Sequence, residues 1–185
     1  MVEEKMRYGN IVAESKEKWE KKSPEEKAAW DSMFKRGVDY WSLMWEVIKR
    51  IEKEFNINVM GIVRDEIWKH FFEAGQRMAK KYEAHGLKDL YDAYTGKFEG
   101  VVDADWLEFN EKVLHKWNRA CPSVQHFRNL GKTDEEIKEI APYYCLQEIG
   151  MITGFNPKFE VFPRTRLLLL GDSHCTYRVE DHGGK

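Results

Sequence analysis

The strongest constraint on the fold is a long amphipathic segment that begins at Ser23-Pro24. Ser23 can cap a helix, Pro24 suits the first helical position, and Glu26 completes a capping box. Apolar residues then recur at helical spacing as far as Phe55. They are Trp30, Phe34, Trp41, Met44, Ile48 and Ile51, with Met33, Tyr40 and Trp45 beside them. The pattern predicts one helix of about 30 residues, provided that Gly37 does not break it.

Two more helices are expected in the N-terminal half. After the break at "NINVMG", apolar residues such as Ile67, Phe71 and Met78 predict a second helix that ends at His85-Gly86. The segment 87–95, "LKDLYDAYT", predicts a shorter third helix. This half of the chain is therefore expected to be helical throughout.

Strand patterns appear only after residue 96. Apolar and polar residues alternate from Trp106 to Arg119, which predicts one strand. Glu111 and Leu114 are out of phase with this alternation, so a bulge is expected near them.

The remainder alternates helix and strand. Residues 121–131 predict a turn and a short helix, and the Thr133 capping box opens a helix that Pro142 should kink or split. Residues 156–181 predict two strands joined by a Gly-Asp turn, with Pro163 restricting the first strand to an edge or a bulge. Together the patterns predict an α+β fold, in which long N-terminal helices pack on a small antiparallel sheet formed mostly by the C-terminal half.

The 185 residues suit a single domain with terminal extensions. Residues 1–22 are expected to be a charged arm or a short helix lying on the body, and residues 181–185 a tail. The domain between them, 23–180, divides into a helical part, 23–95, and a sheet-containing part, 96–180. A chain of this size can bury a core without disulfides or metals.

Composition narrows the class of protein. The net charge of −2 comes from well-mixed charges with no basic stripe, so nucleic acid is not an expected partner. No apolar run reaches the roughly 18 residues that a membrane span needs. The N-terminus shows no apolar export signal, and three cysteines cannot all pair within one chain. We therefore expect a cytoplasmic protein with reduced thiols.

Three thiols are the residues most suggestive of chemistry. Cys121, Cys145 and Cys175 form no C-x-x-C pair, and each could be a packed thiol, a metal ligand or a nucleophile. Cys145 and Glu148 are three apart, so they lie on one helix face. His174 and Cys175 are neighbours on a strand and should point to opposite faces, with Cys175 inward.

The C-terminal two-thirds also carries an ordered set of short motifs. Its segments read "VLHKWNRACPSVQHFRNLG", "YYCLQE" and "GFNPKFEVFPRTRLLLLGDSHCTYRVED". From residue 60 to residue 180 the chain resembles the L-2-amino-thiazoline-4-carboxylate hydrolase family, which is distantly similar to vinyl-reductase-type ligand-binding domains. The matching positions are Cys121-Pro122, Cys145, Glu148 (where the family has Asp), Gly154-Phe155, Pro157, Arg164-Thr165, Gly171-Asp172, Cys175, Tyr177 and Arg178.

The resemblance implies a cytosolic hydrolase that opens a small cyclic, amidine-like substrate. The expected catalytic residues are Cys175, Cys145, Cys121 and Glu148. The expected substrate-binding residues are Arg164, Arg178, Trp117 and His126, where the arginines would clamp a substrate carboxylate.

Two other functions fit the same residues. One is a non-catalytic small-molecule binding or sensor domain with a Trp-lined pocket, since the chain has seven tryptophans. The other is a protein that binds a metal such as zinc through Cys121, Cys145 and Cys175, although the chain can equally function with no cofactor. In each case the N-terminal helices, with their long apolar face, favour a homo-oligomer.

Overall fold

The computed structural model describes residues 2–83 and 85–183, with side chains from Tyr8 onward. Its longer helices are α1 (Val2–Glu20), α2 (Pro24–Phe55) and α3 (Val59–Tyr82). The shorter ones are α4 (Leu87–Ala93), η1 (Thr95–Phe98), α5 (Pro122–Asn129), α6 (Asp134–Tyr144), α7 (Leu146–Phe155) and η2 (Leu168–Leu170). The strands are β1 (Ala104–Phe109), β2 (Val113–Asn118), β3 (Phe159–Val161) and β4 (Cys175–Asp181). The predicted α+β class is confirmed.

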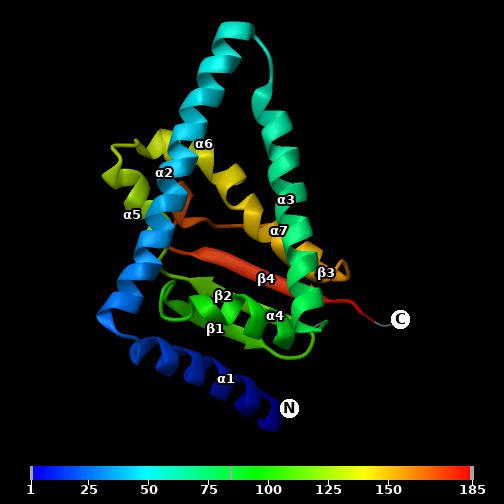
Figure 1. Cartoon of the computed structure of the whole chain (residues 1–185). Helices are drawn as coiled ribbons and strands as arrows, with labels where there is room; N and C mark the ends of the chain where they lie inside the picture. The colour runs from blue at the N-terminus through cyan, green and yellow to red at the C-terminus, as the bar shows by residue number, and fades with distance from the viewer. Residues whose placement is uncertain (1, 84, 184–185) are drawn as a thin grey trace.

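The long helix predicted from Ser23 is α2, and it is continuous through Gly37. The Ser23 side chain accepts from the Glu26 amide while the Glu26 carboxylate accepts from the Ser23 amide, so the predicted capping box is present. The next helix, α3, ends at Tyr82, earlier than predicted, because Glu83 adopts a left-handed conformation. In Figure 1, α2 and α3 form a tall hairpin whose legs diverge towards the sheet.

The sheet is antiparallel, with strand order β1-β2-β4-β3. The single strand predicted from Trp106 to Arg119 is wrong, because this segment is the hairpin of β1 and β2. The Asn110 side chain accepts from the Lys112 and Val113 amides at 2.8 Å each and makes the turn. The bulge falls between Trp106 and Glu108 rather than near Glu111.

The C-terminal strands also differ from the prediction. β3 and β4 pair, as two neighbouring antiparallel strands. The segment that connects them is residues 162–174, which include η2, and it is not the predicted tight Gly-Asp turn. β4 is nevertheless the direct neighbour of β3 in the sheet, and β2 pairs with its other edge. β4 also continues to Asp181, one residue into the predicted tail.

The helix that begins at the Thr133 capping box is predicted to be either kinked or split by Pro142, and in the structure it is split. α6 contains Pro142 and ends at Tyr144, and α7 starts at Leu146, with Cys145 at the junction. Because Pro142 lacks an amide hydrogen, one backbone hydrogen bond of α6 is already missing about one turn before the split at Cys145.

Two hydrophobic clusters make up the interior. One joins the sheet to α1, α4 and α7, and includes Leu90, Leu114, Ile152 and Val179. The other joins α2 to α5 and α6, and includes Val38, Trp45, Phe127 and Ile140. α3 contributes to both clusters, since Met78 packs against the first and Met60 belongs to the second.

α3 and α7 cross at backbone contact. A Cβ on Gly75 would overlap the Met151 carbonyl oxygen, and one on Gly154 would overlap the Phe72 carbonyl oxygen. Only glycine allows two helices to approach this closely. The crossing fixes α7, and with it Cys145, against the α2–α3 hairpin.

The N-terminal segment is a full helix, α1, that runs beneath the sheet in Figure 1. Tyr8 packs on Phe109 with ring centroids 4.6 Å apart, and Lys16 donates to the Ala104 carbonyl oxygen. Trp19 packs directly on the backbone of Gly100. Residues 2–20 thus form a helix that lies on the body. None of the helices described here is long and apolar enough to cross a membrane.

Candidate functional site

A cavity of about 390 Å³ lies between the α2–α3 hairpin and the sheet. Its walls combine aromatic, thioether and aliphatic groups with a few polar ones. These side chains come both from the helices and from the sheet. They include Met33, Phe34, Gly37, Phe71, Tyr94, Phe98, Val102, Lys116, Asn118, Cys121, Tyr144, Cys145, Glu148, Met151, Arg164, Leu169 and Cys175. A cavity of this size and lining is typical of a small-molecule site.

The fold brings the three cysteines, remote in sequence, to this one cavity. Cys121 is the N-cap residue of α5, Cys145 sits at the α6–α7 junction, and Cys175 starts β4. All three are free thiols. Among residues 2–83 and 85–183, however, no group of three His, Cys, Asp or Glu side chains is arranged to hold a metal ion. The predicted zinc ligand set is therefore not assembled by the described residues.

The environment of Cys145 and Cys175 keeps them protonated. Burial raises the pKa of the Cys145 thiol to about 12, against a smaller lowering by Arg164. Burial also raises the pKa of the Cys175 thiol, although its sulfur accepts from the Leu168 amide at 3.1 Å. A thiol must ionise to act as a nucleophile, so neither group is activated at neutral pH.

The raised pKa of Cys145 predicts a loss of stability in alkali. The unfolded thiol ionises near pH 8.5, whereas the folded thiol keeps its proton to about pH 12. Between these values the native state binds more protons, so stability falls as pH rises, by up to about 1.4 kcal/mol per pH unit. Urea unfolding at pH 8 and about pH 10 should show a steeper loss in the wild type than in Cys145→Ala. Equal losses would contradict the assignment.

Two ion pairs supply the charges of the cavity wall. Arg164 pairs with Glu148 from α7 and also lies 5.7 Å over the Tyr177 ring. Lys116 Nζ lies 3.1 Å from Glu99 Oε1, and both side chains are fully buried. Burial lowers the pKa of Lys116, and the neighbouring Glu99 carboxylate opposes that change. Each cation that faces the cavity is thus already neutralised by a carboxylate of the same chain.

Other predicted site residues lie elsewhere. Arg178 is on the opposite face of β4, where its Nε donates to Glu180 at 2.7 Å. Trp117 packs against His174 in a tilted arrangement with ring centroids 4.5 Å apart, and His126 lies 3.0 Å from Asp31 on α2. None of the three lines the cavity described above. Cys175 points inward with Tyr177 and Val179, as predicted, but His174 is buried as well.

Sequence reasoning missed three residues of the site. Lys116 and Glu99 form the buried pair, and Asn118 lines the cavity with an Oδ1 atom that has no hydrogen-bond partner among the described residues. Lys116 stands at an apolar-facing position of a strand between Leu114 and Asn118, which is the one local signal that could have identified it.

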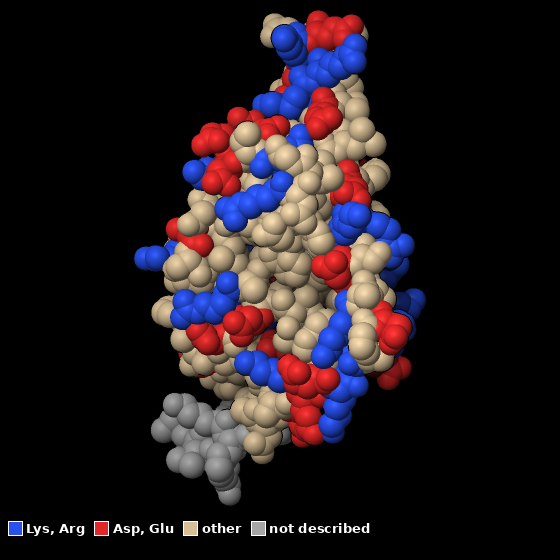
Figure 2. Space-filling model, turned by 90° about the vertical axis from the view of Figure 1, so that its left-hand side faces the viewer, with Lys and Arg blue, Asp and Glu red and all other residues tan. Residues whose placement is uncertain are grey.

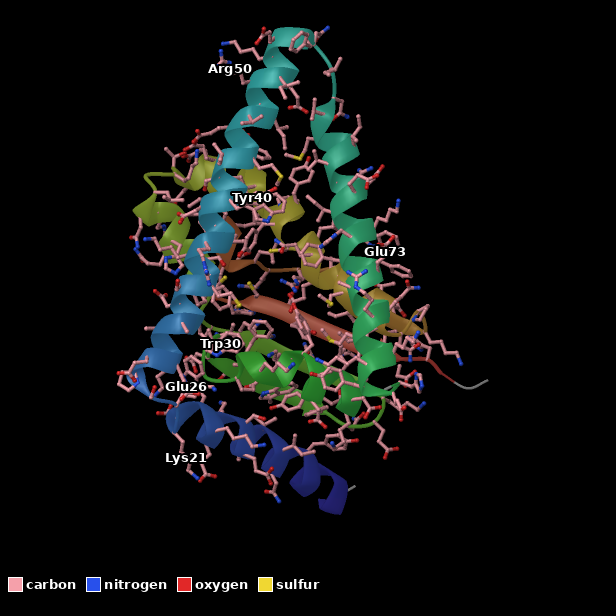
Figure 3. The ribbon with its side chains drawn as sticks, viewed as in Figure 1. Lys21, Glu26, Trp30, Tyr40, Arg50 and Glu73 are labelled. Carbon is pink, nitrogen blue, oxygen red and sulfur yellow. The ribbon has the colours of Figure 1, made fainter. Side chains whose placement is uncertain are left out.

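The tryptophans surround a different space. Trp19 and Trp30 line a second cavity of about 560 Å³ between α1 and the body, together with Tyr91 and Glu99. Figure 3 shows Trp30 near the start of α2, close to α1, where Lys21 is labelled. The aromatic residues that line the cysteine cavity are instead Phe and Tyr, with no Trp among the lining residues that the structure describes. The predicted Trp-lined pocket and the predicted cysteine site are therefore two places and not one.

Comparisons with known proteins test the family resemblance. No family model matches the chain, and no curated protein matches it. One similar solved structure is a trafficking protein particle complex subunit 3 from Naegleria fowleri, covalently bound to palmitic acid. It is 15% identical, and the match covers 78% of this chain and 94% of that chain with a TM-score of 0.48.

These comparisons overturn the family prediction. Because no family model and no curated protein matches the chain, it has no match to a thiazoline-carboxylate hydrolase or a vinyl-reductase-type domain. The predicted hydrolase function, with its cyclic amidine substrate, is therefore wrong. Five of the residues that suggested it line the cavity, namely Cys121, Cys145, Glu148, Arg164 and Cys175.

Proposed function

We propose that this protein is a non-catalytic binding domain for a small, mainly apolar and uncharged molecule. The observation that carries the proposal is the cavity of about 390 Å³ between α2, α3 and the sheet. Apolar surface that is left unfilled in an interior forfeits dispersion contacts, and a ligand restores them.

The charges of the wall favour an uncharged ligand. A carboxylate would have to break the Arg164–Glu148 pair or the buried Lys116–Glu99 pair before it could be bound. Leaving one partner of a buried pair without its counterion costs about 3–5 kcal/mol.

The state of the thiols supports binding rather than catalysis. Cys145 and Cys175 are held as neutral thiols by burial, and Glu148 is engaged by Arg164. The neutral thiols lack the ionised form that a nucleophile requires, and the Glu148 carboxylate is held in its ion pair with Arg164 and is not free to act as a base.

Gly37 provides the test, because it lines the cavity and a Cβ built on it meets no described atom within 4 Å. The probe is N-phenyl-1-naphthylamine, a neutral apolar fluorophore, titrated into the wild type. We expect saturable binding with one probe per chain. In Gly37→Leu the new side chain occupies the cavity, and the affinity should fall by about tenfold or more.

Gly37→Ala is the matched control, since its single methyl group leaves most of the cavity open. It should bind the probe within about threefold of the wild type. A wild type that does not bind the probe saturably, or a Gly37→Leu variant that binds it unchanged, would contradict the proposal. Circular dichroism of the three proteins checks that they share one fold.

A further inference from the structure

The outer face of α2 is apolar and uncovered. Tyr40, Leu43 and Val47 are 68%, 63% and 48% exposed, although the opposite face of the same helix is buried. On the α2 side of the molecule, uncharged residues fill the middle of the surface and charged residues frame them (Figure 2). An amphipathic helix of a soluble domain normally turns such residues inward, so this face indicates contact with another surface.

The charged residues on this face are unused. Arg36, Arg50 and Glu54 make no ion pair with any residue between 2 and 183 that the structure describes. Elsewhere on α2, Glu46 pairs with Lys132 and Lys49 pairs with Glu139. The unpaired charges therefore gather beside the uncovered apolar side chains. Figure 3 shows Tyr40 and Arg50 on this helix, with Arg50 near its end.

The spacing of the outer-face residues of α2 is suited to pairing with the same face of a second copy of the helix. The pairs 43 and 47, 40 and 50, and 36 and 54 all have residue 45 as their midpoint. Trp45 is buried, and residues nine positions away lie two and a half turns from it, on the opposite side of the helix. A two-fold axis through the outer face at the level of Trp45 therefore brings each residue opposite its counterpart in a second, antiparallel α2.

The contacts made in that arrangement are complementary. Leu43 meets Val47 of the second copy, and Tyr40 meets Arg50 of the second copy, an aromatic ring against a guanidinium group. Arg36 meets Glu54 of the second copy, and the two-fold axis makes each of these contacts twice. Like charges are not opposed at any of these positions.

We propose that a second copy of this chain covers the outer face of α2, so that the protein is an antiparallel dimer through this helix. The interface joins the apolar residues at its centre to two Arg36–Glu54 ion pairs near its ends. A different partner protein would need a surface whose apolar and charged residues are complementary to this face. A second copy of the chain has such a surface by symmetry.

Charge reversal in the full chain tests the proposal by sedimentation equilibrium. We expect the wild type to be a dimer at about 100 µM, and Arg36→Glu and Glu54→Arg each to weaken dimerisation by about tenfold or more. The double variant restores opposite charges across the axis and should return to within about threefold of the wild type. Lys53→Glu changes charge on the same helix but away from this face, and should dimerise like the wild type.

A monomeric wild type at that concentration overturns the proposal and leaves the face to a different protein. Single variants that dimerise as well as Lys53→Glu overturn it too, as does a double variant no better than the single ones. The measurement does not use the cavity, so its outcome is independent of the proposed ligand-binding function.

Discussion

Gly154→Ala is expected to destabilise the protein by more than about 3 kcal/mol. Helix propensity alone predicts the opposite sign, because alanine is favoured over glycine inside a helix by about 1 kcal/mol. At this position, however, the new Cβ would overlap the Phe72 carbonyl oxygen, which is backbone and cannot rotate away. α7 would have to move away from α3, which would disturb the packing of Ile152 and Phe155 in the first cluster. Urea unfolding monitored by circular dichroism measures the change.

Gly37→Ala is the control for this prediction. Gly37 is also inside a helix, but its Cβ would meet no described atom within 4 Å. We expect this variant to be more stable than the wild type by about 1 kcal/mol. A Gly154→Ala protein within about 1 kcal/mol of the wild type would show that α3 and α7 are not packed at backbone contact.

Glu99→Gln is the second change with a large expected effect, a loss of about 3–5 kcal/mol. The substitution keeps the shape of the side chain and an acceptor for the Trp106 ring nitrogen, which lies 3.3 Å from Glu99 Oε2. It removes the charge that balances the buried Lys116 ammonium group. The remaining aromatic contacts, with Trp106 at 5.0 Å and Tyr177 at 5.5 Å, cannot replace a carboxylate.

The same variant should respond to pH in a defined direction. Burial already lowers the pKa of Lys116, and the loss of Glu99 removes the group that opposes this change. The native state then binds fewer protons than the unfolded chain, so the stability of Glu99→Gln should rise from about pH 7 towards pH 10 relative to the wild type.

A double variant separates charge balance from packing. Glu99→Gln with Lys116→Met removes both charges and keeps an apolar stem in place of the lysine. Replacing a buried ion pair with neutral side chains is often close to neutral for stability, so most of the loss should be recovered. A double variant as unstable as Glu99→Gln would show that the pair is not the cause.

Much of the secondary structure was predictable, because it depends on residues close together in sequence. The capping boxes at Ser23 and Thr133 and the interruption after Pro142 each involve contacts within about one turn. The hairpin at Asn110 was missed for a related reason. Alternation continues on both sides of the turn, and the side chain that makes the turn is one residue within that pattern.

The candidate site was predictable in part. The positions of the three cysteines and of Glu148 and Arg164 were singled out, and all five line one cavity. Their ionisation states were not predictable, since they depend on how deeply each group is buried and on which neighbour it meets. Arg164, expected to hold a substrate carboxylate, instead holds Glu148 of the same chain.

The sequence by itself determined the helices, the class of fold and the apolar stripe of α2, because helical spacing and caps are interactions between residues a few positions apart. Only the tertiary structure decided that Lys116 and Glu99 meet in the interior, that α3 and α7 touch through glycines, and that a cavity lies between the hairpin and the sheet. Each of these depends on a distance between residues remote in the chain, and packing sets that distance.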